Sequence, residues 1–172
     1  MRGFTLLELL VAIAVLAVLT ALAVPAGRAL QGRALVAAES LQLLTLLRLA
    51  RTRAVLAGTD AVLCPLRAGD DGPACAVARG EGWLAFSDHD GDRDFDAGDT
   101  VLRMAASAGP ALDVTTRSGA PFTGRIVYRA DGTVSTPTTL QLCVGPERPG
   151  RRLIISMTGR VRTTREGLTC RG

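Results

Sequence analysis

The sequence lacks the residues and motifs on which most enzymes depend. It has a single histidine, His89, and no lysine, so its 20 basic side chains are all Arg. It contains no G-x-S-x-G, phosphate-binding-loop or H-E-x-x-H pattern. A protein that is not an enzyme and needs no cofactor is therefore predicted.

Aromatic side chains are also scarce, with one Trp, one Tyr and four Phe in 172 residues. Proteins that hold single-stranded nucleic acid stack the bases on aromatic rings, and none of these rings lies near the C-terminal tail. Any binding of nucleic acid is therefore expected to involve mainly phosphates and to be independent of base sequence.

What the sequence does have is a long apolar run near its N-terminus. The 21 residues from Phe4 to Val24 carry one charge, that of Glu8. A helix of this length rises about 31 Å, enough to cross a bilayer core, so a transmembrane helix is predicted. A carboxylate in such a segment is unfavourable and indicates a functional role. A cleaved secretory signal peptide is the alternative, but the run is too long and lacks a small-residue cleavage site after it.

This N-terminal segment resembles the leader and helix of a type IV prepilin. A short basic leader ends in Gly3, Phe4 starts the helix, Thr-Leu-Leu-Glu-Leu follows, and the apolar run reaches Pro25. The resemblance implies that a prepilin peptidase cleaves after Gly3 and methylates the amine of Phe4. It also implies that Glu8 pairs with the Phe4 amine of a neighbouring subunit, so that assembly neutralises the carboxylate.

The same resemblance implies a location and partners. The protein would cross the inner membrane once, with its head on the periplasmic side. It would then join other pilins in a pilus, which can extend to the cell surface, or in a pseudopilus.

Four cysteines are predicted to form disulfides, because the periplasm is oxidising. Three connectivities are possible. We favour Cys64–Cys75, which closes a short loop rich in turn residues, and Cys143–Cys170, which holds the C-terminal tail. A zinc site is the alternative, but it would need close pairs such as C-x₂-C, which are absent.

Helical periodicity continues from the apolar run to about Leu56. Pro25, with the nearby Gly27 and Gly32, should weaken or kink this helix. The apolar stripe of its second half consists of Val36, Leu43, Leu47, Ala50 and Ala54. The polar stripe consists of Glu39, Gln42, Thr45, Arg48 and Thr52.

From Gly58 onward the pattern is typical of β-structure. About seven short apolar runs at hairpin spacing predict an antiparallel sheet or two facing sheets. The strongest hairpin signal is Asp131-Gly132, and Thr158-Gly159 predicts a turn before the last run. The predicted fold class is α+β. The pilin resemblance implies a leader (1–3), a transmembrane or filament-core helix (4–24), an amphipathic half (25–57) packed on an antiparallel sheet, and a β-rich head (58–172).

An acidic loop, SDHDGDRDFDAGD, separates two of the predicted strands. Calcium takes six to eight oxygen ligands, and alternate aspartates could supply them. The candidate ligands are Asp88, Asp90, Asp92 and Asp94. The EF-hand pattern is not met, because Arg93 stands where Gly is needed and Asp99 where Glu is needed. A solvated hairpin tip without metal is the simpler interpretation.

Charge is unevenly distributed along the chain. Residues 60–104 hold ten acidic and four basic side chains, whereas residues 125–172 hold nine Arg and three acids. Strand alternation places Arg160 and Arg162 on one face, about 6.6–6.8 Å apart along the strand. Their guanidinium groups suit phosphate oxygens. Three further arginines are close in sequence: Arg151, Arg152 and Arg165.

Most of the chain is similar to the FimT/GspH family of minor pilins and pseudopilins. The similarity rests on GWLAF followed by an acidic loop and VLR, on the early Cys pair, and on G-R-x-R near the last Cys. It implies that Gly159, Arg160 and Arg162 bind DNA during natural transformation. The alternative is a GspH-type minor pseudopilin with a structural role at the tip of a type II secretion pseudopilus.

Overall fold

The computed structural model describes residues 6–69, 72–77, 80–109, 112–145, 150–164 and 170, apart from the side chains of residues 22–26, 28, 29 and 68. The chain divides into two compact units, residues 1–34 and residues 35–172. The second unit contains all nine strands described, together with the second half of the long helix.

One helix, α1, extends over Leu6–Ala57 and is 52 residues long. The helix continues through Pro25, so the proline that was expected to weaken or kink it does not end it. The side chains from Leu6 to Ala21 are all exposed. In the part of the chain that the structure describes, no helix is long and apolar enough to cross a membrane.

The second half of α1 is amphipathic, and its apolar stripe forms part of the core. All five residues that the periodicity predicts to be buried are at most 3% exposed. They are Val36, Leu43, Leu47, Ala50 and Ala54. Burying a leucine side chain of this kind stabilises the fold by about 1.5–3 kcal/mol, so the stripe accounts for much of the attachment of α1 to the head.

Glu39 departs from the predicted polar stripe. It is 0% exposed, and its carboxylate accepts hydrogen bonds from Trp83 Nε1 at 2.5 Å and from the Ala108 amide at 2.6 Å. A buried carboxylate is tolerated when hydrogen bonds replace its lost hydration. The prediction that Glu39 faces solvent was therefore wrong. Helical periodicity could not reveal its partners, which lie 44 and 69 residues away in the sequence.

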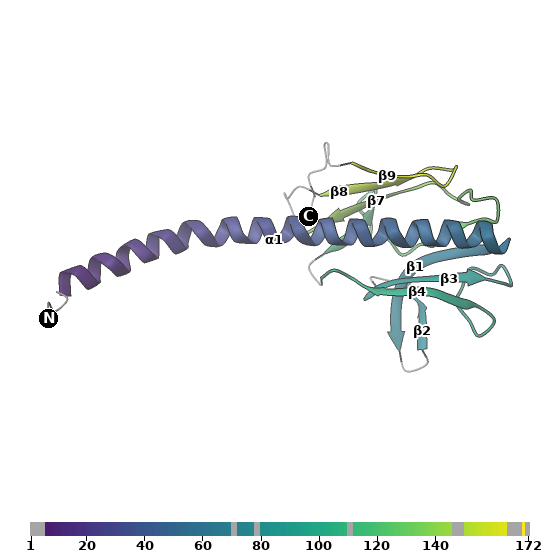
Figure 1. Ribbon diagram of the computed structural model, residues 1–172, viewed down its shortest axis with the longest axis horizontal. Coiled ribbons are helices and arrows are strands. Elements are labelled where there is room, and N and C mark those ends of the chain that lie inside the picture. Colours follow the sequence, from purple (N-terminus) through teal and green to yellow (C-terminus); the bar gives the residue numbers. More distant parts are fainter. Residues whose placement is uncertain are drawn as a thin grey trace. The chain divides into compact units, whose positions relative to one another are not determined.

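Two antiparallel sheets pack against the second half of α1, which runs between them in Figure 1. The first sheet has the order β2-β1-β3-β4, with β6 also pairing with β1. Its strands are β1 (Asp60–Gly69), β2 (Gly72–Cys75), β3 (Gly82–Asp88), β4 (Thr100–Ala106) and β6 (Ile126–Tyr128). The second sheet has the order β5-β7-β8-β9. Its strands are β5 (Asp113–Thr116), β7 (Thr138–Cys143), β8 (Arg151–Ile155) and β9 (Val161–Thr164).

The four cysteines form two disulfides, with the pairings favoured from the sequence. Cys64 is bonded to Cys75, with a Cα–Cα distance of 5.6 Å, and Cys143 to Cys170, at 5.8 Å. The first bond joins β1 to β2, so the predicted turn-rich loop is a hairpin. Its strand β2 gave no apolar pattern that would have identified it.

Peptide mapping under non-reducing conditions is expected to recover these two linkages from the intact protein. Each bridge closes a loop in the unfolded chain and should stabilise the head by about 2–4 kcal/mol. A crossed linkage, such as Cys64 with Cys143, would contradict the structure.

Candidate nucleic-acid interface

Strands β8 and β9 form a hairpin, and its turn consists of residues 156–160. The first two residues of the G-R-x-R sequence, Gly159 and Arg160, lie at the end of this turn. The Gly159 amide donates to the carbonyl oxygen of Ser156 at 2.9 Å, and the Ser156 amide donates to that of Arg160 at 3.0 Å. The Val134 amide donates to the carbonyl oxygen of Met157 at 2.9 Å. The turn is therefore held both by its own hydrogen bonds and by the neighbouring chain.

The register of the hairpin decides which side chains reach solvent. Val161 pairs with Ile155, which is 1% exposed, and packs against the core, whereas Arg162 pairs with Ile154, which is 40% exposed. Directly paired residues of an antiparallel sheet share a face, so Arg162 lies on the face turned away from the core. Arg160, at the end of the turn, is also exposed.

We call the face of β7, β8 and β9 that is turned away from the core the outer face. Pairing of Gln141 with Arg152, of Arg152 with Thr164 and of Ile154 with Arg162 defines it. Its described positions on these three strands are Thr139, Gln141, Cys143, Arg152, Ile154, Arg162 and Thr164. None of the seven is acidic, and the face offers cationic groups, hydroxyls and an amide that can donate hydrogen bonds to phosphate. Asp113 of β5, which pairs with Cys143, lies at the far edge of the same face.

The structure brings only some of the predicted arginines to this face. Arg151 lies on the opposite side of β8, with Leu153, and its Nη1 donates to the Oγ of buried Ser40 at 2.8 Å. Arg151 therefore fixes β8 to α1, and we leave it out of the DNA-contacting set proposed below. Arg152 is half-buried on the outer face, and its Nε has no hydrogen-bond partner in the part described. Arg165 lies outside the described residues.

Gly159 occupies a position that only glycine fits. Its φ is +73°, in the left-handed region that favours glycine. A Cβ here would overlap the carbonyl oxygen of Gly132 and come within 3.1 Å of Arg51 Nε and Tyr128 Cε1. The glycine of G-R-x-R therefore has a structural role in this chain.

Replacing Gly159 with Ala is expected to destabilise the protein strongly. The left-handed backbone alone costs about 1–3 kcal/mol for a residue with a Cβ, and the overlap with Gly132 adds to it. Urea unfolding measures the change. Gly119→Ala is the control, because Gly119 also has a positive φ, +90°, but has nothing within 4 Å of its Cβ position. If Gly159→Ala and Gly119→Ala lower the free energy of unfolding equally, the contact with the Gly132 carbonyl oxygen does not contribute to the loss of stability.

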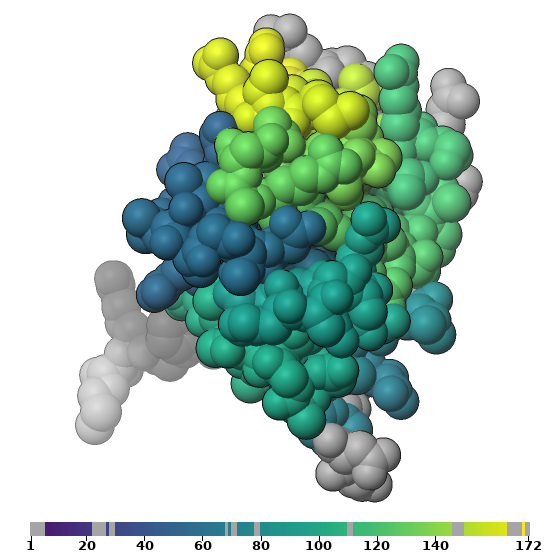
Figure 2. Space-filling view, turned by 90° about the vertical axis from the view of Figure 1, so that its right-hand side faces the viewer, coloured from purple at the N-terminus to yellow at the C-terminus, as the bar shows by residue number. Residues whose placement is uncertain are grey.

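Two residues that the sequence did not single out hold the same turn. Tyr128, fully buried, donates its hydroxyl to the carbonyl oxygen of Gly159 at 3.4 Å, and burial raises the pKa of Tyr128 to about 12 although the nearby charge of Arg51 opposes this. Arg51 Nη2 donates to the carbonyl oxygen of Thr158 at 3.0 Å. Figure 2 shows the end of α1 in blue, residues near 130 in green and the hairpin in yellow adjoining on one face.

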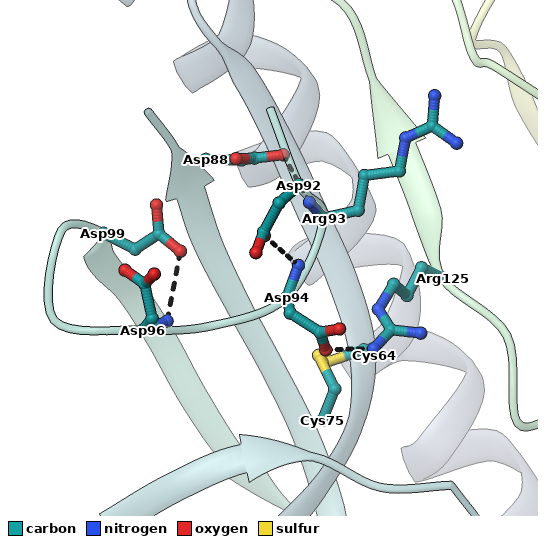
Figure 3. Close-up of a disulfide and its surroundings, with 9 residues drawn as sticks. All are labelled: Cys64, Cys75, Asp88, Asp92, Arg93, Asp94, Asp96, Asp99 and Arg125. Carbon is teal, nitrogen blue, oxygen red and sulfur yellow. Dashed lines mark hydrogen bonds and ion pairs between the residues drawn. A yellow bond between two sulfur atoms is a disulfide. The ribbon is translucent and has the colours of Figure 1, made fainter. Parts of the chain in front are cut away.

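The acidic loop between β3 and β4 is ordered by hydrogen bonds to its own backbone (Figure 3). Asp88, which is 3% exposed, accepts from the amides of Gly91 at 2.8 Å and Arg93 at 3.1 Å. Burial raises the pKa of Asp88. Asp94, one of the candidate calcium ligands, forms an ion pair with Arg125.

Carboxylates of this loop also approach one another. One oxygen from each of Asp88, Asp90 and Asp99 lies within 4.8 Å of the others, and the same holds for Asp90, Asp92 and Asp96. Asp99 accepts from the amides of His89 and Asp96. The hydrogen bonds from backbone amides give Asp88 and Asp99 a structural role that requires no cation.

The predicted processing and assembly residues lie in the first compact unit. Glu8 is exposed in the first turn of α1, and Pro25 lies within the helix. Gly3 and Phe4 lie outside the described residues.

Comparisons with known proteins agree with this architecture. The family model "Type II transport protein GspH" matches residues 39–159, and the model "Prokaryotic N-terminal methylation motif" matches residues 1–24. No curated protein sequence matches the chain.

Three solved structures are similar to this one. Two are crystal structures of the type IV minor pilin FimU of Pseudomonas aeruginosa (strain PAO1). The first has 20% identity and a TM-score of 0.60 and covers 80% of this chain and 93% of FimU. The second has 21% identity and a TM-score of 0.56 and covers 77% and 94%. The third is the minor pseudopilin EpsH from the type 2 secretion system of Vibrio cholerae, with 17% identity, a TM-score of 0.49 and coverage of 74% and 94%. The similarity to FimU shows the fold, a long N-terminal helix packed on antiparallel β-sheet.

Proposed function

This chain belongs to the GspH family of minor pilins and pseudopilins, and we propose that it is a subunit of a type IV pilus that binds DNA. In this proposal it has no enzymatic activity. It serves DNA uptake during natural transformation by contacting duplex phosphates with the arginines of the β8–β9 hairpin.

One observation carries the proposal: Arg160 and Arg162 are both exposed on either side of Val161, which packs against the core. The first ends a turn that is held by three backbone–backbone hydrogen bonds and by the side chains of Arg51 and Tyr128. The second lies on a strand paired with β8. A firm backbone fixes the positions from which the two guanidinium groups reach phosphates, so less backbone freedom is lost on binding.

The composition of the outer face sets the kind of nucleic acid expected. Its described positions on β7, β8 and β9 include no aromatic ring on which a base could stack. Arginine, hydroxyl and amide groups instead suit backbone phosphates. We therefore expect duplex DNA to bind with little dependence on base sequence.

The N-terminal methylation motif supports the rest of the proposal. We expect a prepilin peptidase to cleave between Gly3 and Phe4 and to methylate Phe4. Residues 4–24 would hold the subunit in the inner membrane, with the head in the periplasm, until Glu8 pairs with the Phe4 amine of a neighbouring pilin.

The proposal is tested by comparing duplex binding of the wild-type protein, in non-ionic detergent, with that of Arg160→Gln/Arg162→Gln. A matched control is Arg67→Gln/Arg103→Gln, which removes two exposed arginines from β1 and β4 of the first sheet. Only the hairpin variant is expected to bind more weakly, by about tenfold or more, because two phosphate contacts are lost. Equal weakening by both variants would show that net charge alone governs binding.

A structural role in type II secretion is the second candidate, favoured by the description of the matching family as a type II transport protein. In that role the hairpin arginines would contact another pseudopilin or exported protein. It predicts weak or no DNA binding by the wild-type protein, and loss of protein export on deletion. Genes for pili and competence beside this one, or genes for secretion, would also discriminate.

A further inference from the structure

We propose that Arg51 of α1 is a positioning residue that holds the β8–β9 turn so that Arg160 and Arg162 present their guanidinium groups together. The inference rests on the proposed DNA-binding function of that pair, and it adds a residue from the helix to the site.

The contact itself is direct. Arg51 Nη2 donates to the carbonyl oxygen of Thr158 at 3.0 Å, across 107 residues of sequence. Thr158 comes two residues before Arg160, so the bond fixes the backbone immediately before the first DNA-contacting side chain. Hydrogen bonds from a charged donor to a carbonyl are stronger than neutral ones.

Two glycines line the guanidinium group of Arg51, and Gly159 is the one that makes room for it. A Cβ on Gly132 would lie 3.4 Å from Arg51 Nε, and one on Gly159 would lie 3.1 Å from it. Both glycines have positive φ, +78° and +73°. A flat guanidinium group fits against the two glycines, whereas the tetrahedral ammonium of lysine has neither its plane nor its fork of donors.

Arg51 is one of three supports that the rest of the chain gives the turn. Tyr128 at the end of β6 donates to the carbonyl oxygen of Gly159, and the Val134 amide donates to that of Met157. Of the three, only Arg51 lies on the helix and carries a charge. It is also exposed, so it can be replaced without opening the core.

The test is a double-mutant cycle on the full chain in non-ionic detergent, with a labelled duplex as the probe. Arg51→Gln is expected to weaken binding about tenfold in the wild-type background. In the Arg160→Gln/Arg162→Gln background it is expected to change binding by less than about twofold, because a residue that acts only through that pair has nothing left to position. Arg53→Gln is the matched control, since Arg53 is also exposed but points to another side of α1.

Arg51→Lys tests how much the shape of the donor group matters. Lysine keeps the charge and can still donate one hydrogen bond to the Thr158 carbonyl, but from a flexible ammonium, so we expect its affinity to lie between that of Arg51→Gln and that of the wild-type protein. If Arg51→Gln weakens both backgrounds equally, the positioning role is overturned and Arg51 acts as an independent phosphate contact.

Hydrogen exchange without DNA tests the structural half of the inference separately. Arg51→Gln should speed exchange in a peptide covering residues 156–162 and leave peptides from β1 and β3 unchanged. Unchanged exchange in the hairpin peptide would overturn the inference whatever the DNA result. If the wild-type protein does not bind duplex DNA, the proposed function fails, whereas faster hairpin exchange would still show that Arg51 holds the turn.

Discussion

Raising the salt concentration from about 50 to 200 mM is expected to lower the affinity of the wild-type protein for duplex DNA by roughly a hundredfold. About four arginines, which we take to be Arg152, Arg160, Arg162 and Arg165, would release counterions on contacting phosphates and give a slope near −3.6 in log K against log salt. Replacing both Arg160 and Arg162 with Gln should flatten the slope by about two units. Unrelated duplex sequences should bind alike, because phosphate contacts carry no base information.

The salt titration should be made on both proteins with the same labelled duplex, and with circular dichroism as a control for folding. The fold should survive the double change, since both side chains are exposed and the core and disulfides are untouched. The Arg67→Gln/Arg103→Gln control should keep the wild-type slope. If the hairpin variant is folded and binds DNA with unchanged affinity and slope, this hairpin is not the DNA-binding site.

Replacing Glu8 with Ala is expected to leave the protein processed and in the membrane but absent from sheared filaments. A carboxylate within an apolar environment is costly unless a cation neutralises it. In the proposed assembly the Phe4 amine of a neighbouring subunit is that cation. Without the carboxylate the incoming subunit loses the charge pair that sets its position, so incorporation should fall to near background.

Immunoblots of sheared pili and of membranes measure the two pools separately. Glu8→Asp is the matched control, because it keeps the carboxylate, and it should restore part of the incorporation. Full incorporation of the Ala variant would contradict the pairing, and loss of cleavage would show that Glu8 acts on the peptidase step.

Local patterns predicted the elements of this fold well. The 3.6-residue period identified the buried stripe of α1, and the Asp131-Gly132 and Thr158-Gly159 signals identified real turns. Both disulfide pairings followed from loop length and composition. Local pattern could not reveal β2, because Gly-Pro-Ala-Cys has no apolar alternation and is held by pairing with β1.

Local pattern did not reveal side chains whose partners are distant in sequence. Glu39 is buried and accepts from Trp83, 44 residues away, which the predicted polar stripe missed. Arg151 donates to Ser40, 111 residues away. A helical or strand period says nothing about such partners. The same reason hid the role of Arg51, whereas the exposure of Arg160 and Arg162 around Val161 could be predicted from strand alternation alone.

Mapping the DNA contact on the protein tests the central claim most directly. A short duplex titrated into ¹⁵N-labelled protein in non-ionic detergent should shift the amides of Arg160, Arg162 and neighbouring positions of the outer face, such as Thr164. Amides of the first sheet, including that of Arg103, should stay unchanged. Shifts confined to the first sheet, or none at DNA concentrations that saturate binding, would contradict the proposal that the β8–β9 hairpin is the DNA-binding site.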